Sequence, residues 1–103
     1  EFYSTNNSKS ILCYIEGTGN TLTRTFNNCK FVCEGTAEKS AIMINPSANA
    51  GYNTYVININ NCTATGYGEK GISGQTIVGV KATVKDDITV NINGKQVYRN
   101  EVK

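Results

Sequence analysis

Alternation of apolar and polar residues narrows the fold of this chain more than any other feature. In the run YNTYVININ, Tyr55, Ile57 and Ile59 fall on one side of an extended chain, and the residues between them fall on the other. A period of two residues is typical of a half-buried β-strand. No segment repeats its apolar residues with a helical period. The sequence therefore predicts an all-β fold.

The last part of the chain carries the strongest hairpin signal. An Asn-Gly pair at 93–94 lies between alternating residues, and both central positions of the favoured two-residue turn require a positive φ. Such a turn would place Val90 opposite Val97. The residues expected on its buried face are Ile88, Val90, Ile92 and Val97.

The remaining predicted strands are short. Ser10–Ile15 and Leu22–Phe26 flank a glycine-punctuated turn and predict a second hairpin, and Phe26–Cys33 alternates as one continuous strand. With Ala41–Ile44 and Thr76–Val84, the sequence predicts six or seven short, mostly antiparallel strands, packed as a small disulfide-stapled β-sandwich or barrel. We identify no internal repeat.

Length and charge limit the number of domains and the kinds of partner. A single domain, 1–103, accounts for the whole chain, and Glu1-Phe2 is set aside because these residues also arise as a cloning scar. The formal charge is only +2 and the basic residues are scattered, which argues against a nucleic-acid partner. No apolar run approaches the roughly 20 residues that cross a bilayer, so no stable membrane insertion is expected.

Four cysteines in a short chain without histidine predict a disulfide framework and hence an oxidising compartment. Two N-glycosylation sequons, at Asn6 and Asn61, agree with this prediction. We therefore expect a secreted, extracellular glycoprotein. A zinc site is disfavoured, because structural zinc ligands usually come in two close pairs and this chain has one close pair and two single cysteines. No metal or cofactor is expected.

The predicted strands constrain the cysteine pairing without fixing it. Cys29 and Cys33 would lie about 13 Å apart in a continuous strand, which is too far for a disulfide. The predicted hairpin keeps Cys13 away from both, which leaves Cys62 as its partner. Two disulfides then require a bend between the close pair, or a shifted or absent hairpin; otherwise one pair stays reduced. We favour Cys13–Cys62, with a bend at 30–32 that permits Cys29–Cys33.

Residues suited to catalysis are scarce. Without histidine the chain lacks the usual general base for a serine or cysteine nucleophile, and most of its acidic residues fall in predicted turns. We therefore expect no enzymatic activity. Gly66–Gly71 matches the letters of a dinucleotide-binding fingerprint, but a β-branched, glycine-interrupted run follows it instead of a helix. We interpret 65–75 as a loop available for recognition.

Tyrosines are the main candidates for binding, because they combine a large contact area with a polar tip. Tyr14 and Tyr55 are expected in the core or the wall of the barrel. The candidate binding residues are Tyr67, Lys70, Tyr98 and Arg99.

Three segments together resemble the MAX effectors, secreted virulence proteins of plant-pathogenic fungi that include the ToxB-type toxins. The segments are LCYI at 12–15, YVININNC at 55–62 and VNINGKQV at 90–97. The resemblance implies a six-stranded β-sandwich with a disulfide from the first strand to the end of the fourth, which would here be Cys13–Cys62. It also implies a small, secreted, non-enzymatic effector or virulence factor that binds a host protein.

Two other functions are carried as alternatives. Residues 86–94, followed by Tyr98, are similar to the closing segment of cyanovirin-type lectins, which implies carbohydrate binding. A secreted killer-type toxin that acts on membranes fits the size and charge of the chain. The expected partner is thus a host protein or a glycan, and exposed edge strands are compatible with a monomer or a weak dimer.

Overall fold

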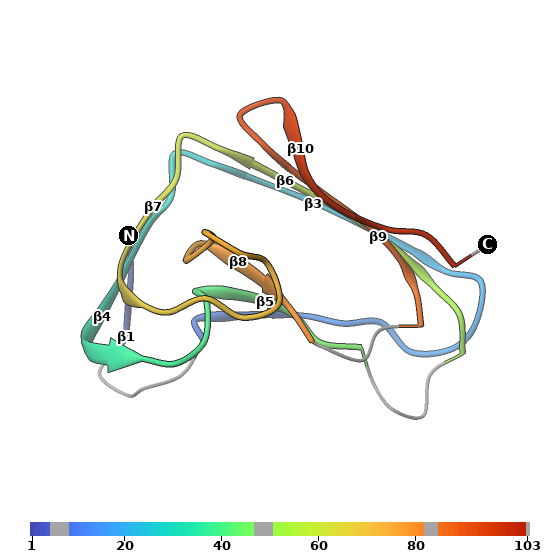
Figure 1. The fold of residues 1–103 in the computed structure, drawn as a ribbon, viewed down its shortest axis with the longest axis horizontal. Helices are drawn as coiled ribbons and strands as arrows, with labels where there is room; N and C mark the ends of the chain where they lie inside the picture. The colour runs from blue at the N-terminus through green and yellow to red at the C-terminus, as the bar shows by residue number, and fades with distance from the viewer. Residues whose placement is uncertain (5–8, 47–50, 82–84, 103) are drawn as a thin grey trace.

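The computed structural model describes residues 1–4, 9–46, 51–81 and 85–102, and in these it contains ten β-strands and no helix (Figure 1). The all-β prediction is confirmed, although six or seven strands were expected. The strands are β1 (Phe2–Ser4), β2 (Ile11–Cys13), β3 (Thr21–Asn27), β4 (Lys30–Ala37), β5 (Ile42–Ile44), β6 (Thr54–Asn60), β7 (Thr63–Tyr67), β8 (Val78–Val80), β9 (Asp87–Ile92) and β10 (Lys95–Asn100).

From β1 to β9, successive strands belong to different sheets, and every third strand returns to the same one. The sheets have the orders β1-β4-β7, β2-β5-β8 and β3-β6-β9-β10. All neighbours run parallel except β9 and β10. The chain therefore winds through three coils, β1–β3, β4–β6 and β7–β9, before β10 folds back. This is the architecture of a parallel β-helix, and Figure 1 looks along the axis of the coils.

The expected antiparallel sandwich or barrel is wrong for a physical reason. A two-residue period records which side of a strand is buried, and burial is the same whether the neighbouring strand runs parallel or antiparallel. The predicted hairpin of Ser10–Ile15 with Leu22–Phe26 does not form, because β2 and β3 lie in different sheets. The glycine-punctuated turn is instead a corner of the coil, where the Gly19 amide donates to the Tyr52 carbonyl at 2.7 Å.

The chain also contains an internal repeat, contrary to the interpretation from sequence. In one sheet Thr21 pairs with Thr54, and Thr54 pairs with Asp87, so equivalent residues of successive coils are 33 apart in sequence. Asn27 and Asn60, whose side chains are hydrogen-bonded, have the same separation. The repeat is visible as FNNC at 26–29, INNC at 59–62 and INGK at 92–95. Each coil thus stacks on a copy of itself, as in other solenoids.

The repeated asparagine or glycine turns the chain after β3, β6 and β9, at a corner after the first two and in the hairpin after the third. Asn28, Asn61 and Gly94 have φ values of 57°, 54° and 78°. Residues other than glycine rarely adopt this left-handed conformation, and asparagine is among those that tolerate it best. Asn28 therefore ends β3, and the single strand predicted over Phe26–Cys33 is two strands in different sheets.

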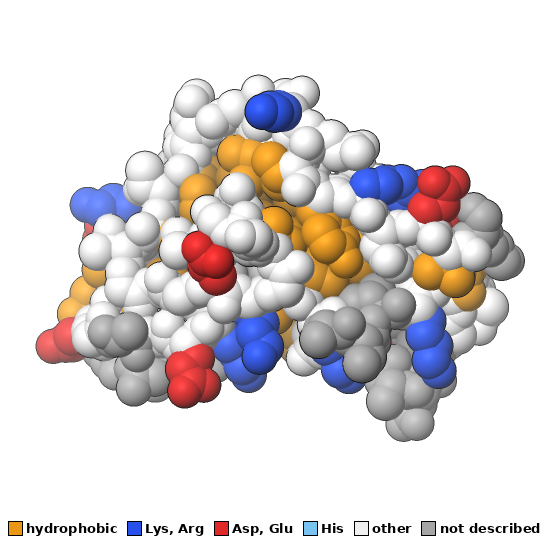
Figure 2. Space-filling model, in the orientation of Figure 1, with side chains coloured by type: hydrophobic (Ala, Val, Ile, Leu, Met, Phe, Trp, Pro, Cys, Tyr) orange, Lys and Arg blue, Asp and Glu red, His pale blue; other side chains and the backbone are white. Residues whose placement is uncertain are grey.

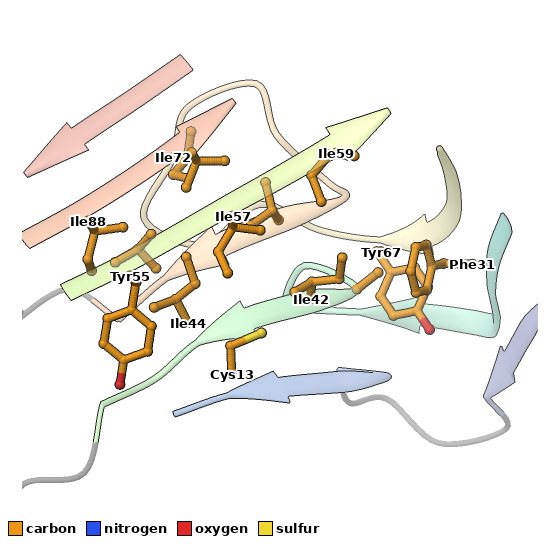
Figure 3. Packing of buried hydrophobic residues seen from close by; sticks show 14 of the residues in the cluster. Cys13, Phe31, Ile42, Ile44, Tyr55, Ile57, Ile59, Tyr67, Ile72 and Ile88 are labelled. Atoms are coloured by element: carbon orange, nitrogen blue, oxygen red, sulfur yellow. The ribbon is translucent and has the colours of Figure 1, made fainter. Parts of the chain in front are cut away.

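The core fills the interior that the three sheets enclose. The alternation predicted for β6 is confirmed, since Tyr55, Ile57 and Ile59 are each 0% exposed. Figure 3 shows the two isoleucines and the pair Ile42 and Ile44 of β5 pointing toward this shared interior. Burying a side chain of this size stabilises the fold by about 1.5–3 kcal/mol relative to exposure.

The predicted β9–β10 hairpin is confirmed, but its register differs past the turn. Gln96 pairs with Asn91 as a two-residue turn requires, and a bulge then places Tyr98, rather than Val97, opposite Val90. The extra residue in β10 bends the strand. Val97 and Tyr98 are both partly buried and pack against the core.

The end of the solenoid formed by the third coil is covered by its own chain along β8 and β9, but not along β7, which pairs with β4 alone among the described strands. β10 pairs with the edge of β9. Along β8, the Val80 amide donates to the Lys70 carbonyl at 2.7 Å, and Ile72 of the same segment is only 5% exposed in the core cluster. We call residues 68–75 the capping loop. Figure 2 shows hydrophobic atoms in the middle of one face, in the region of β8 and β10, framed by polar and charged side chains.

Candidate functional site at the open end of the first coil

In the part of the chain that the structure describes, the first coil is covered on one side only. Its strands β1, β2 and β3 each have a single neighbour, namely β4, β5 and β6. The outer edges of these three strands therefore carry backbone N–H and C=O groups that no described strand pairs. Proteins usually protect such edges with charged residues or proline. Here Arg24 is the one charged residue within the three strands.

Exposed hydrophobic side chains gather on the same coil. Of the five large hydrophobic residues exposed in the described structure, four lie here: Phe2 (41%), Tyr3 (60%), Leu12 (43%) and Tyr14 (47%). Leu12 pairs in register with Met43 of the second coil, which is only 4% exposed. The position that is exposed at Leu12 in the first coil is thus buried at Met43 in the second coil, which has a neighbouring coil on both sides. Tyr14 was expected in the core or the wall of a barrel, and its exposure shows that it is not a core residue.

A hollow of about 250 Å³ lies beside β2 and β3. Its walls are mainly apolar, with one guanidinium and one thiol. It is lined by Ile11, Leu12, Cys13, Tyr14, Leu22, Arg24 and Phe26.

Arg24 occupies a position that faces the core in the other two coils. It pairs in register with Ile57, which pairs with Val90, and both of these are 0% exposed. At the edge of the first coil the arginine side chain is exposed to solvent, and its guanidinium donates to the Thr23 carbonyl at 2.9 Å. Neither ion pair found among the described residues involves Arg24. The hollow therefore offers a cation to a ligand.

The other polar groups near the hollow hold its walls in place. Burial raises the pKa of the Cys13 thiol, and the charge of Arg24 counteracts this only in part. Cys13 is therefore a protonated wall residue at neutral pH and a poor nucleophile. The buried Tyr55 hydroxyl accepts the Ile15 amide at 3.0 Å, which fixes the chain just after β2.

Two of the four candidate binding residues lie at the third coil. Tyr67 is only 7% exposed at the end of β7, where its hydroxyl bonds that of Ser10, so it cannot serve as a surface anchor. Lys70 has an exposed side chain, but its carbonyl holds the edge of β8. The glycine-rich segment is thus a cap rather than a free recognition loop, and no helix follows it among the described residues.

Tyr98 and Arg99 are neighbours on β10 and do not line the hollow of the first coil. Tyr98 is partly buried against the core, and Arg99 lies 3.9 Å from a carboxylate oxygen of Glu101. Of the two sequons, Asn6 lies outside the described residues. Asn61 is exposed at a corner, where its amide donates to the Asn93 side chain at 2.9 Å.

No disulfide joins the four cysteines, all of which lie in the described part of the chain. The expected pairs Cys13–Cys62 and Cys29–Cys33 are therefore not found. Cys13 lies in β2, and Cys62 follows β6 at a corner between two other sheets. The chain does turn near Cys29, but at Asn28, before both members of the close pair, and β4 is extended between them.

Among the described residues, no group of three or more histidine, cysteine or acidic residues is placed to hold a metal ion. None of the chain's described segments forms a helix of the length and hydrophobicity that would span a membrane.

No protein-family model matches the chain, and no curated protein and no solved structure matches it either. What can be inferred about function therefore comes from the residues themselves.

The sequence contains one signal of the hollow, a charged residue on the apolar side of a strand. Leu22, Arg24 and Phe26 alternate along β3, and the charged residue interrupts an otherwise apolar face. An inward-facing charge marks an edge strand in a β-protein. Which edge stays open depends on the stacking of the coils, which only the structure reveals.

Proposed function

We propose that this chain is a secreted, non-enzymatic binding protein that docks a protein partner on the open end of its first coil. The observation that carries the proposal is the coincidence, on one coil, of strand edges that no described strand covers, exposed hydrophobic side chains and an apolar hollow containing Arg24. The narrower role of an effector or virulence factor acting on a host protein is supported by the sequence resemblance alone.

Addition of a strand is the binding mode that this surface favours. An extended peptide that pairs with the edge of β3 would satisfy backbone groups, and pockets for alternate side chains would provide specificity. Leu22, Arg24 and Phe26 lie on one side of that edge and line the hollow. The partner would therefore present an apolar side chain and a carboxylate two residues apart, the carboxylate paired with the guanidinium.

Selection from a displayed library of short random peptides tests this proposal. The wild-type chain is expected to enrich peptides in which an aspartate or glutamate lies two residues from an apolar residue. Arg24→Glu should instead enrich lysine or arginine at that position. A selected acidic peptide should bind Arg24→Glu at least about tenfold more weakly than wild type, because a charge-assisted hydrogen bond is lost and a like charge is introduced.

Arg99→Glu is the matched control, since Arg99 is on β10, away from the hollow. It changes the net charge as Arg24→Glu does and should leave peptide enrichment and affinity unchanged. Equal enrichment by all three proteins, or an equal loss of affinity in both variants, would contradict docking at the first coil.

Glycan binding is a second candidate, favoured by the outer face of the β3-β6-β9 sheet. Asparagine side chains form rows across the coils: Asn91 donates to Asn58 at 3.0 Å, and Asn60 donates to Asn27 at 3.0 Å. Such rows form a polar surface of donors and acceptors. Binding to a glycan array that Asn58→Ala abolishes and Arg24→Glu leaves intact would support this function and contradict the first.

A further inference from the structure

Cys29 and Cys62 occupy the same position of successive coils. Asn27 pairs with Asn60 before them, and Lys30 pairs with Thr63 after them. The corner between these pairs stays in register, because the Asn28 amide donates to the Asn60 carbonyl at 2.8 Å and the Thr63 amide donates to the Cys29 carbonyl at 3.0 Å. Paired strands lie about 4.8 Å apart. A disulfide tolerates α-carbons about 4.4–6.8 Å apart, so the backbone spacing suits one.

The two cysteines are also in direct contact. The Cys29 amide donates to the Cys62 sulfur at 3.4 Å. The Cys29 thiol points to the Asn27 carbonyl at 3.5 Å, and the Cys62 thiol lies 3.4 Å from both the Phe26 carbonyl of β3 and the Asn60 carbonyl of β6. Both side chains thus lie at the ends of the paired strands β3 and β6. Desolvation, followed by the proximity of Cys62, raises the pKa of the Cys29 thiol. Both cysteines are only partly buried, so a small reagent can reach them.

We propose that Cys29 and Cys62 form a disulfide that links the first coil to the second. The oxidant is a small-molecule disulfide. One cysteine thiolate attacks it and releases one small thiol, and the second cysteine thiolate then attacks the mixed disulfide and releases the other. One protein S–S bond forms, one small-molecule S–S bond breaks, and the two protein thiol protons end on the two released thiols. Cys13 and Cys33 are each 4% exposed and take no part.

The tryptic peptides of this chain allow a direct test, because each cysteine falls in a different one. Cys13 lies in 10–24, Cys29 in 25–30, Cys33 in 31–39 and Cys62 in 40–70. The native chain is incubated with oxidised glutathione, the remaining thiols are alkylated, and the digest is analysed by mass spectrometry without reduction. A link between 25–30 and 40–70, with an intact mass lower by two hydrogens, is expected.

Three variants separate this disulfide from general oxidation. Cys29→Ser and Cys62→Ser should abolish the link, whereas Cys13→Ala should retain it. Oxidation should also raise the Tm of the wild type, by on the order of 10 °C, and leave the Tm of Cys29→Ser unchanged. A link of 10–24 to 40–70, a link of 25–30 to 31–39, or glutathione adducts without a link in the folded protein would overturn the proposal.

Discussion

At the scale of single residues, the capping loop shows how closely the backbone of this chain packs. Gly71 and Gly74 both have positive φ, 81° and 80°. A side chain on Gly71 would meet the Val80 carbonyl oxygen at 2.0 Å, whereas a side chain on Gly74 would have nothing within 4 Å. The two positions thus share one backbone conformation and differ in the space around it.

Alanine at these two glycines is a matched test of the cap. Gly74→Ala should lower the free energy of unfolding by about 1–2 kcal/mol, the cost of a left-handed alanine. Gly71→Ala should cost clearly more, because the segment that covers β8 must move away. Denaturant melts of both variants give the comparison. Equal losses would mean that the capping loop does not press against β8.

Residue identity alone could not have located the site. Tyr67 follows the pattern of a surface anchor, because it is a tyrosine in a glycine-rich segment. In the structure its hydroxyl bonds that of Ser10, 57 residues away along the chain. Arg24 is the kind of residue expected on the solvated face of a strand, but the register pairs it with Ile57. Both outcomes depend on which coil stacks on which.

At the scale of elements, the strands were predictable and their partners were not. The alternation in β6 and the Asn-Gly turn between β9 and β10 are local signals, and both predictions are confirmed. The residues after β2 carry an equally good turn signal. The amide of Gly51 donates to the Gly17 carbonyl at 2.9 Å, so that turn stacks on the next coil instead of reversing the chain. Glycines that permit a hairpin also permit a corner.

The left-handed conformation at the corners is testable at Asn61, which has a φ of 54°. Asn61→Val should lower the free energy of unfolding by about 1–2 kcal/mol, because a β-branched residue is strained in this region. Asn61→Gly is the control, and it should change stability by only a few tenths of a kcal/mol if the conformation is what matters. Thermal or urea melts measure both, and a similar loss in the two variants would point to the asparagine side chain instead.

At the scale of the whole molecule, stacked coils make stability a sum over neighbouring coils. Each coil of a solenoid contacts only those beside it. The second coil has a neighbour on both sides. The third is covered along β9 by β10 and along β8 by the capping loop, while β7 has no described strand beyond β4, and the first has no such cover on any of its three outer edges within the described chain. The coil that carries the proposed docking surface is therefore the least stabilised of the three. Binding of a partner strand would supply the neighbour that the first coil lacks.

Hydrogen exchange of the native chain measures this gradient. Amides of β6, which pairs with β3 and β9, should exchange most slowly, and those of β2, which pairs with β5 alone, should exchange faster by on the order of 100-fold or more. The Cys29–Cys62 disulfide should slow exchange in the first coil and leave β10 unchanged, because it joins only the first two coils. Uniform protection in the reduced protein would mean that the three coils open as one unit, and the first coil would then have no separate instability for a partner to relieve.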